Sequence, residues 1–350
     1  MIRRKKKYLF LSLALAMGIG TGLLSGCSTS KVVEDNSSEK EAITEETESS
    51  TKQLAKAKII NDSSSFWRFA YLWKETPEEL NRLLQGDWLY DNIKFNHGPL
   101  LSRYALIADG NYIEGELEEE QRGTDAYLEN NPQYNKYDFI SEGDSPSFFY
   151  LINNGLRSLE DPTYGGWGGR FGVVSDTLWK NTVLDFNPYS NRYEVEYSLV
   201  RWFNDIQNDF AARADWCISN PIVSVEEGID LSAFAGEEIT LHAKAEDPDG
   251  DIVSFKWWHY AEADTYEESK VKKNEEKVED IDGLQISINR ELAQDEIVDN
   301  IVLDGADTEK LTFTVPEDAK VGDTIHIILE GIDDGKFNLK SYQRVIITVK

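Results

Sequence analysis

The chain has 350 residues, of which 64 are acidic and 36 basic, so its formal net charge is −28 at pH 7 and its pI is near 4.5. A chain this acidic repels phosphate groups, which argues against nucleic-acid binding. Its 9 Trp, 16 Tyr and 15 Phe need burial, which argues against global disorder. The length fits about two domains, and two cysteines cannot form a disulfide framework.

The amino end has the composition of a signal peptide. Residues 2–7 read IRRKKK, residues 8–24 carry no charge, and the run closes on LSGC at 24–27. A membrane-spanning anchor is the alternative, but the run is short for a span of about 20 residues. We therefore predict a lipoprotein signal peptide over 1–26, lipidation of Cys27, and an extracytoplasmic protein held on the bacterial cell membrane by lipid. Removing 1–26 takes away five basic residues and no acidic ones, so the mature net charge becomes −33.

A tether and a first domain follow the signal peptide. Residues 27–57 are rich in Ser, Thr, Glu and Lys and hold no aromatic residue, which predicts a disordered acidic tether. Residues 58–218 are predicted to form the first folded domain, in which 194–217 is the strongest helix candidate. Its apolar residues step by three and four: Leu199, Trp202, Phe203, Ile206, Phe210 and Ala214.

After Asn220-Pro221 the period of the apolar residues changes to two. Six alternating segments predict an antiparallel β-sandwich over 219–350: VSVEEG, EITLHAKAEDPDGD, IVSFKWWHY, LTFTVP, TIHIILEGIDDG and RVIITVK. The charged stretch 264–300 interrupts this pattern, and we expect it to be partly mobile. The chain ends on a strand, so the carboxyl end is expected to be tied down.

Two motifs of the β-domain have both a functional and a structural interpretation. Asp247, Asp249 and Asp251 alternate in DPDGD and can ligate Ca²⁺, although Asp-Pro-Asp-Gly is also good turn chemistry and we favour the turn. Trp257 and Trp258 are neighbours on a strand, so one ring points inward and the other outward. One of them is a candidate platform for stacking a sugar ring, and a buried position at the sandwich edge is the equal alternative.

The first domain contains the glycine-rich sequence GGWGGR at 165–170. Four glycines around Trp167 let the backbone approach a ligand or another chain segment closely, but the segment lacks the pattern of a phosphate loop. In the alternative interpretation Trp167 fills a gap and Arg170 pairs with an acid. The other candidate ligand-binding residues are Asn96, His97, Glu142, Asp144, Asn154, Asn208, Asp209 and Arg213.

Two of these candidates also have an ordinary structural role. His97 can act as a general acid or contact a ligand, although a structural hydrogen bond is the default. Asp209 and Arg213 have the spacing of an ordinary helical ion pair. The sequence shows no zinc-ligand spacing and no G-x-S-x-G nucleophile motif, so the catalytic residues stay unassigned.

Three segments resemble one bacterial family: NHGPL at 96–100, SEGDSPSFFYLINNGLRSLEDPTYGGWGGRF at 141–171 and RWFNDIQNDFAARADWC at 201–217. The family is that of cellulose-binding proteins with a nucleoside-hydrolase-like domain followed by an immunoglobulin-like domain. DPDGD, FKWWHYAEADTY and YQRVIITV resemble its second domain. The resemblance implies a partial nucleoside-hydrolase-like α/β domain, then an all-β immunoglobulin-like sandwich, with a polysaccharide or small sugar as ligand.

The chain departs from this family at its amino end. The hydrolases of this class carry an aspartate-rich strand that binds Ca²⁺ and activates water, and no such strand precedes residue 66. We therefore expect the first half of the α/β domain to be missing and an exposed sheet edge that a partner chain can cover. By resemblance, Glu142, Asp144, Asn208 and Asp209 lie in the segments that contact sugar or metal.

These observations predict a surface-anchored lipoprotein that binds a cellulose-like glycan, does not bind nucleic acid and lacks catalysis. The alternative is a calcium-dependent hydrolase of N-glycosidic bonds, completed by a second chain, with Ca²⁺ as its cofactor. A third interpretation is a degenerate fragment that folds poorly.

Overall fold

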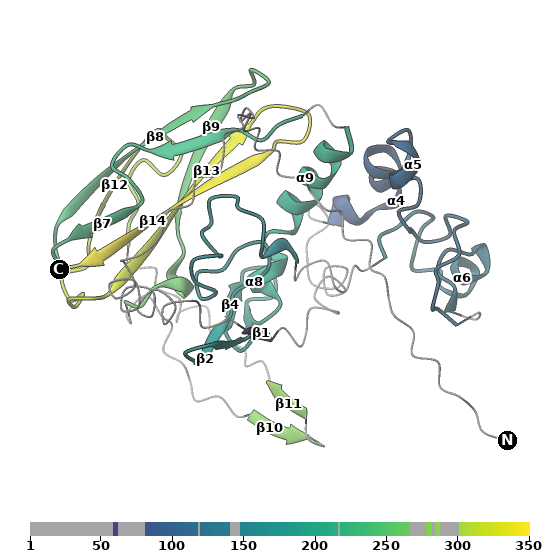
Figure 1. Cartoon of the computed structure of the whole chain (residues 1–350), viewed down its shortest axis with the longest axis horizontal. Helices are drawn as coiled ribbons and strands as arrows, with labels where there is room; N and C mark the ends of the chain where they lie inside the picture. The colour runs from purple at the N-terminus through teal and green to yellow at the C-terminus, as the bar shows by residue number, and fades with distance from the viewer. Residues whose placement is uncertain are drawn as a thin grey trace, which may run out of the picture.

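The computed structural model describes residues 59–61, 81–117, 120–140, 148–215, 218–266, 278–281, 284–287 and 301–350. Short helices and small sheets make up the amino-terminal part, and long strands make up the carboxyl-terminal part (Figure 1). Cys27, the tether, Glu142 and Asp144 lie outside the described residues. Within the described residues, no helix is long and apolar enough to cross a membrane.

The amino-terminal part contains short elements. Its helices are η2 (Arg82–Leu84), α4 (Gly86–Leu89), the π-helix η3 (Tyr90–Lys94), α5 (Gly98–Leu101), α6 (Asp125–Asn130), α8 (Tyr197–Val200) and α9 (Phe203–Asp215). Its strands are β1 (Ile59–Asn61), β2 (Gly172–Ser175), β3 (Leu178–Lys180), β4 (Asp185–Asn187) and β5 (Arg192–Glu194). The order β1-β3-β2 forms one sheet, in which β1 is parallel to β3, and β4 pairs with β5.

The helix predicted over 194–217 is shorter and is broken in two. Residues 192–194 pair with β4 as strand β5, and the helical residues fall into α8 and α9 with Arg201 and Trp202 between them. The apolar spacing is right for α9, whose buried residues include Phe203, Ile206 and Ala214. Local strand pairing overrides helix formation at the start of the predicted segment because the β4–β5 hairpin buries Glu194 against Asn187.

The carboxyl-terminal part forms two sheets. The first has the order β12-β8-β6, from β12 (Lys310–Thr314), β8 (Glu238–Glu246) and β6 (Ile222–Val225). The second has the order β7-β14-β13-β9, from β7 (Asp230–Ala233), β14 (Lys340–Val349), β13 (Thr324–Asp333) and β9 (Val253–His259). A short 3-10 helix, η5 (Ala261–Ala263), follows β9, and β10 (Val278–Ile281) pairs with β11 (Leu284–Ser287).

All six predicted strands are present, and the chain ends on β14 as expected. Strand β7 was not predicted; it pairs in parallel with β14 over Asp230–Ala233. Its four residues, DLSA, do alternate polar and apolar, but so short a run with one large apolar side chain is a weak signal in the sequence.

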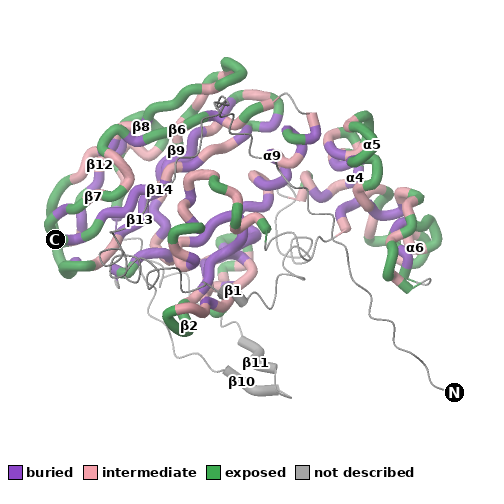
Figure 2. The backbone as a smooth tube through the Cα atoms, viewed as in Figure 1, coloured by how far each residue is buried: buried purple, intermediate pink, exposed green. Residues whose placement is uncertain are grey.

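Both faces of the four-stranded sheet are buried. Along β13, Ile325, Ile327 and Leu329 point into a core shared with the three-stranded sheet, which we call the second core. Ile328 points the other way, into a first core that also contains Leu84, Trp202 and Phe203. The second sheet is therefore a middle layer, and most residues of β13 and β14 are buried (Figure 2).

Candidate functional site

The glycine-rich loop contributes side chains to the first core. Trp167 is 3% exposed and packs edge-to-face on Tyr342 of β14. The Arg170 guanidinium donates from Nε to Oδ1 of Asp185 at 2.7 Å and from Nη2 to the Leu184 carbonyl at 2.9 Å. The structure therefore matches the alternative in which Trp167 fills the interior and Arg170 pairs with an acid.

Asp185 joins the two parts of the molecule. Its Oδ2 accepts from Arg201 at 3.1 Å and from the Tyr260 hydroxyl at 2.6 Å, and its side chain is fully buried. Burial alone would raise the pKa of Asp185, but Arg170 and Arg201 outweigh it and hold that pKa below its ordinary value. The carboxylate is thus ionised and satisfied within the protein.

Arg344 of β14 binds residues 156–164, the segment that precedes GGWGGR. Its buried guanidinium donates to the carbonyls of Leu156 at 2.8 Å and Tyr164 at 2.7 Å, and Nη1 lies 2.9 Å from Nδ1 of His326. Burial lowers the pKa of Arg344 to about 10. Burial, together with Arg344, lowers the pKa of His326 to about 2, so this imidazole is neutral and accepts from Arg344.

Backbone hydrogen bonds attach the same loop to β14. The Tyr342 amide donates to the Asn154 carbonyl and the Arg344 amide to the Gly155 carbonyl, both at 3.1 Å. Gly155 has φ of 91°, and a Cβ there would lie 1.7 Å from the Tyr342 carbonyl oxygen. Asn154 thus lies in an internal contact between the two parts.

Three of the polar candidates in α9 and the NHGPL segment, Asp209, Arg213 and His97, also make internal contacts. Asp209 accepts twice from Arg213, at 2.6 and 3.1 Å. His97 contacts Asp215 through Nδ1 at 2.9 Å and the Asp91 carbonyl through Nε2 at 3.1 Å. Asn96 is exposed with φ of 64°, and Asn208 is partly buried.

The DPDGD motif forms a turn. Oδ1 of Asp247 accepts from the amides of Asp249 at 2.8 Å and Asp251 at 3.1 Å, which is the geometry of an Asx turn. Across the described part of the chain, no group of three His, Cys, Asp or Glu residues is arranged to hold a metal ion. The turn that we favoured from the sequence is thus present.

The two adjacent tryptophans lie on opposite faces of β9, as expected. Trp257 is 2% exposed in the second core. Trp258 packs against the first core, where the guanidinium carbon of Arg201 lies 4.9 Å from its ring centroid and Trp202 lies beside it. Trp257 is therefore not available as a platform for a sugar, and Trp258 is only partly exposed because Arg201 and Trp202 pack against it.

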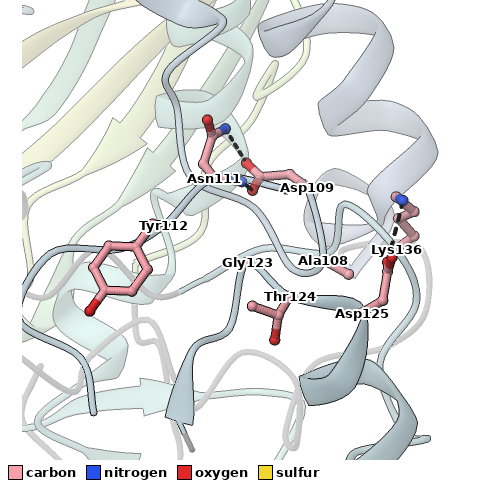
Figure 3. A pocket seen from close by; sticks show the side chains of 9 residues that line it. Ala108, Asp109, Asn111, Tyr112, Gly123, Thr124, Asp125 and Lys136 are labelled. Carbon is pink, nitrogen blue, oxygen red and sulfur yellow. Dashed lines mark hydrogen bonds and ion pairs between the residues drawn. The ribbon is translucent and has the colours of Figure 1, made fainter. Parts of the chain in front are cut away.

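A cavity of about 330 Å³ lies in a segment from which the sequence analysis drew no candidate residue (Figure 3). Its lining comes from three stretches of chain: Ala108, Asp109, Gly110, Asn111 and Tyr112; Gly123, Thr124 and Asp125; and Lys136. No hydrophobic period marks these polar, glycine-rich stretches, so pattern reasoning does not find them. Asn-Tyr beside an Asp-Gly turn is the one available signal, and it is weak.

A buried carboxylate organises one wall of the cavity. The Asp109 side chain accepts from Lys94 at 2.7 Å, from the Leu106 amide at 2.9 Å and from both nitrogens of Asn111. Burial would raise the pKa of Asp109, but the hydrogen bonds from Lys94 and Asn111 lower it below the ordinary value. Asp109 therefore holds Lys94 and the wall residue Asn111 in place.

Two regions of the chain match models of known protein families. Residues 50–171 match the model described as "Cellulose-binding Sde182, nucleoside hydrolase-like domain", and residues 238–349 match "Cellulose-binding protein Sde0182, C-terminal domain". The two regions thus match the two domain models of one family of cellulose-binding proteins. The resemblance inferred from the sequence is thereby confirmed; the two models cover about two thirds of the chain, and the first includes the cavity.

One solved structure is similar in part. It is a nucleoside hydrolase-related hypothetical protein from Saccharophagus degradans that is associated with carbohydrate metabolism. The identity is 21% and the TM-score 0.44, over 86% of this chain and 74% of that one. No curated protein matches the chain.

Proposed function

We propose that this protein is a surface-anchored lipoprotein that binds a cellulose-like glycan and has no catalytic activity. The observation that carries the proposal is that both of its matched regions correspond to domains of a cellulose-binding protein. The LSGC sequence at 24–27 supports attachment through lipid at Cys27.

The internal contacts of the polar candidates support binding without catalysis. Arg170, Asp209 and His97 each form an ion pair or a close polar contact inside the protein. Side chains engaged in this way stabilise the fold, and a catalytic group would instead need to reach the reacting atoms.

The test of binding is retention of the mature chain on insoluble polysaccharides. Cellulose, xylan and chitin are incubated with the protein, and the bound fraction is measured against an unrelated acidic protein of similar size. We expect retention on cellulose. Loss of the protein to the supernatant with every polysaccharide would contradict the proposal.

The test of anchoring is metabolic labelling with a fatty acid. We expect label and membrane recovery for the natural chain, and neither for Cys27→Ser. A labelled Cys27→Ser chain would contradict lipidation at Cys27.

Calcium-dependent hydrolysis of an N-glycosidic bond is the second candidate function. The nucleoside-hydrolase-like description of residues 50–171 favours it. The measurement is release of reducing sugar from nucleosides with and without Ca²⁺, and the alternative assumes completion by a second chain. Turnover that a calcium chelator abolishes would replace the non-catalytic proposal.

We also propose that the carboxyl-terminal part is an immunoglobulin-like sandwich and that β2 is an edge for a partner chain. The strand orders β12-β8-β6 and β7-β14-β13-β9, with one core between them, support the first proposal. The exposed Val173 and Val174 of β2 support the second. Crosslinking in the cell, with Val173→Lys as the variant, tests the edge; an unchanged crosslinking pattern would contradict it.

A further inference from the structure

The cavity beside Tyr112 is held in shape by buried hydrogen bonds. Gln121, which is 2% exposed, accepts from the Ile113 amide at 3.0 Å and donates to the Ile113 carbonyl at 2.9 Å. Ala108 and Gly110 donate through their amides to the carbonyls of Arg122 and Gly123 at 2.8 and 2.9 Å. The chain on either side of Tyr112 is therefore fixed before any ligand binds, which reduces the entropy lost on binding.

Glycine is needed where the two stretches meet. A Cβ at Gly123 would lie 1.9 Å from the Asn111 carbonyl oxygen. This close approach brings the stretch 108–112 against 122–125, and both stretches line the cavity. Asp109, tied to Lys94, sets the position of Asn111 in the same wall.

The groups that reach the solvent differ from those that hold the frame. The Tyr112 residue is 70% exposed, and the side chains of Asp125 and Lys136 are 79% and 49% exposed. The Tyr112 ring lies on one side of the cavity and the Asp125–Lys136 pair on the other (Figure 3). A tyrosine exposed to this extent contributes little to folding, and its ring is available for contact with a ligand.

The chemistry of these three side chains fits an uncharged sugar. The face of an aromatic ring suits the apolar C–H face of a pyranose, while a carboxylate accepts and an ammonium donates hydrogen bonds to hydroxyl groups. A volume of about 330 Å³ is at the lower end of the ~300–1,000 Å³ found for small-ligand sites. The mature net charge of −33 opposes the approach of acidic polysaccharides.

We propose that this cavity binds one pyranose ring of a neutral glycan. Tyr112 stacks on the ring, and Asp125 and Lys136 hydrogen-bond to its hydroxyl groups. The proposal rests on the proposed function and adds its binding site and the charge class of its ligand.

The experiment compares binding isotherms of the full mature chain on insoluble cellulose with those of two variants. Tyr112→Ala removes the platform, and Tyr189→Ala removes another exposed tyrosine, 48% exposed in the β4–β5 turn, as the matched control. We expect Tyr112→Ala to weaken binding about tenfold or more, as for an aromatic anchor, and Tyr189→Ala to leave it unchanged. Asp125→Ala is expected to weaken binding by a smaller factor, and unchanged far-ultraviolet circular dichroism reports that each variant is folded.

The possible outcomes separate the site from the function. If the natural chain and Tyr112→Ala bind cellulose equally, the site is wrong and glycan binding stands. If the natural chain binds no polysaccharide, both are wrong. Retention on polygalacturonate that equals retention on cellulose would overturn the neutral character of the ligand.

Discussion

Asp185 is the carboxylate that binds Arg170, Arg201 and Tyr260. We expect its removal to destabilise the fold. Asp185→Asn leaves Arg170 buried without its counter-charge and Arg201 with only the longer contact to Glu262 at 3.9 Å, so we expect the free energy of unfolding to fall by about 3–5 kcal/mol. Denaturant unfolding measures it. Asp87→Asn, at an exposed pair with Arg82, is the control and should cost less than about 1 kcal/mol. Equal losses of unfolding free energy in the two variants would show that the buried network contributes no more to stability than an exposed ion pair.

The buried, neutral His326 makes the free energy of unfolding depend on pH in the acid range. Its folded pKa of about 2 lies below the ordinary 6.5, so below pH 6.5 the unfolded chain binds a proton that the folded chain excludes. This contribution is fully present above pH 6.5 and is lost as the pH falls, by about 2 kcal/mol between pH 6.5 and 5. We expect His326→Gln, whose amide oxygen can still accept from Arg344, to lose less stability than the natural chain over this range. Parallel stability–pH curves would rule the imidazole out as the cause.

Contacts of single side chains were predictable only where the partner lies nearby in the sequence. The Asp209–Arg213 pair follows from helical spacing alone. The acid that pairs with Arg170 could be expected in kind, but Asp185 lies in a polar stretch and meets Arg170 through tertiary packing. Tyr112 and Lys136 are brought to one cavity by loops, whose path no period in the sequence specifies.

At the scale of elements, the attachment of residues 154–156 to β14 depends on one glycine. Gly155→Ala places a methyl group against the Tyr342 carbonyl and also requires a positive φ. Gly228 has a similar φ of 95° with open space around it, so Gly228→Ala measures the cost of φ alone, about 1 kcal/mol. We expect Gly155→Ala to cost at least about 2 kcal/mol more, measured by thermal and denaturant unfolding. A similar loss in both variants would mean that the loop moves away from β14 without penalty.

Six strands of the carboxyl-terminal part were predictable because each alternates apolar and polar residues or is apolar on both faces, whereas β7, a run of four residues, was missed. Strand β13 is buried at nearly every position, and the reason lies outside its own sequence: the amino-terminal part covers its second face. Contacts outside the segment also explain why the helical period predicted α9 but missed β5. The conformation of β5 is decided by its pairing with β4.

At the scale of the whole molecule, the first core draws on both matched regions. Trp202, 2% exposed, packs against Trp258, Tyr260 and Tyr342 of the β-rich part. We expect one calorimetric transition whose van't Hoff enthalpy equals the measured enthalpy. Trp202→Ala should lower the midpoint temperature of that single transition, because the substitution opens a cavity between the two parts. Two separated transitions, only one of them shifted by Trp202→Ala, would mean that the two parts unfold independently.

The position of β14 in the chain decides when the protein can fold. Residues 340–349 supply Tyr342 and Arg344, which hold the segment around Gly155 and complete the first core. Chains are synthesised from the amino end, and independent domains usually fold as they emerge. Here the first core lacks one of its strands until residues 340–349 have been made, so we expect the amino-terminal part to complete its folding only after that point. A premature stop that removes only this strand would deprive both halves of their common layer.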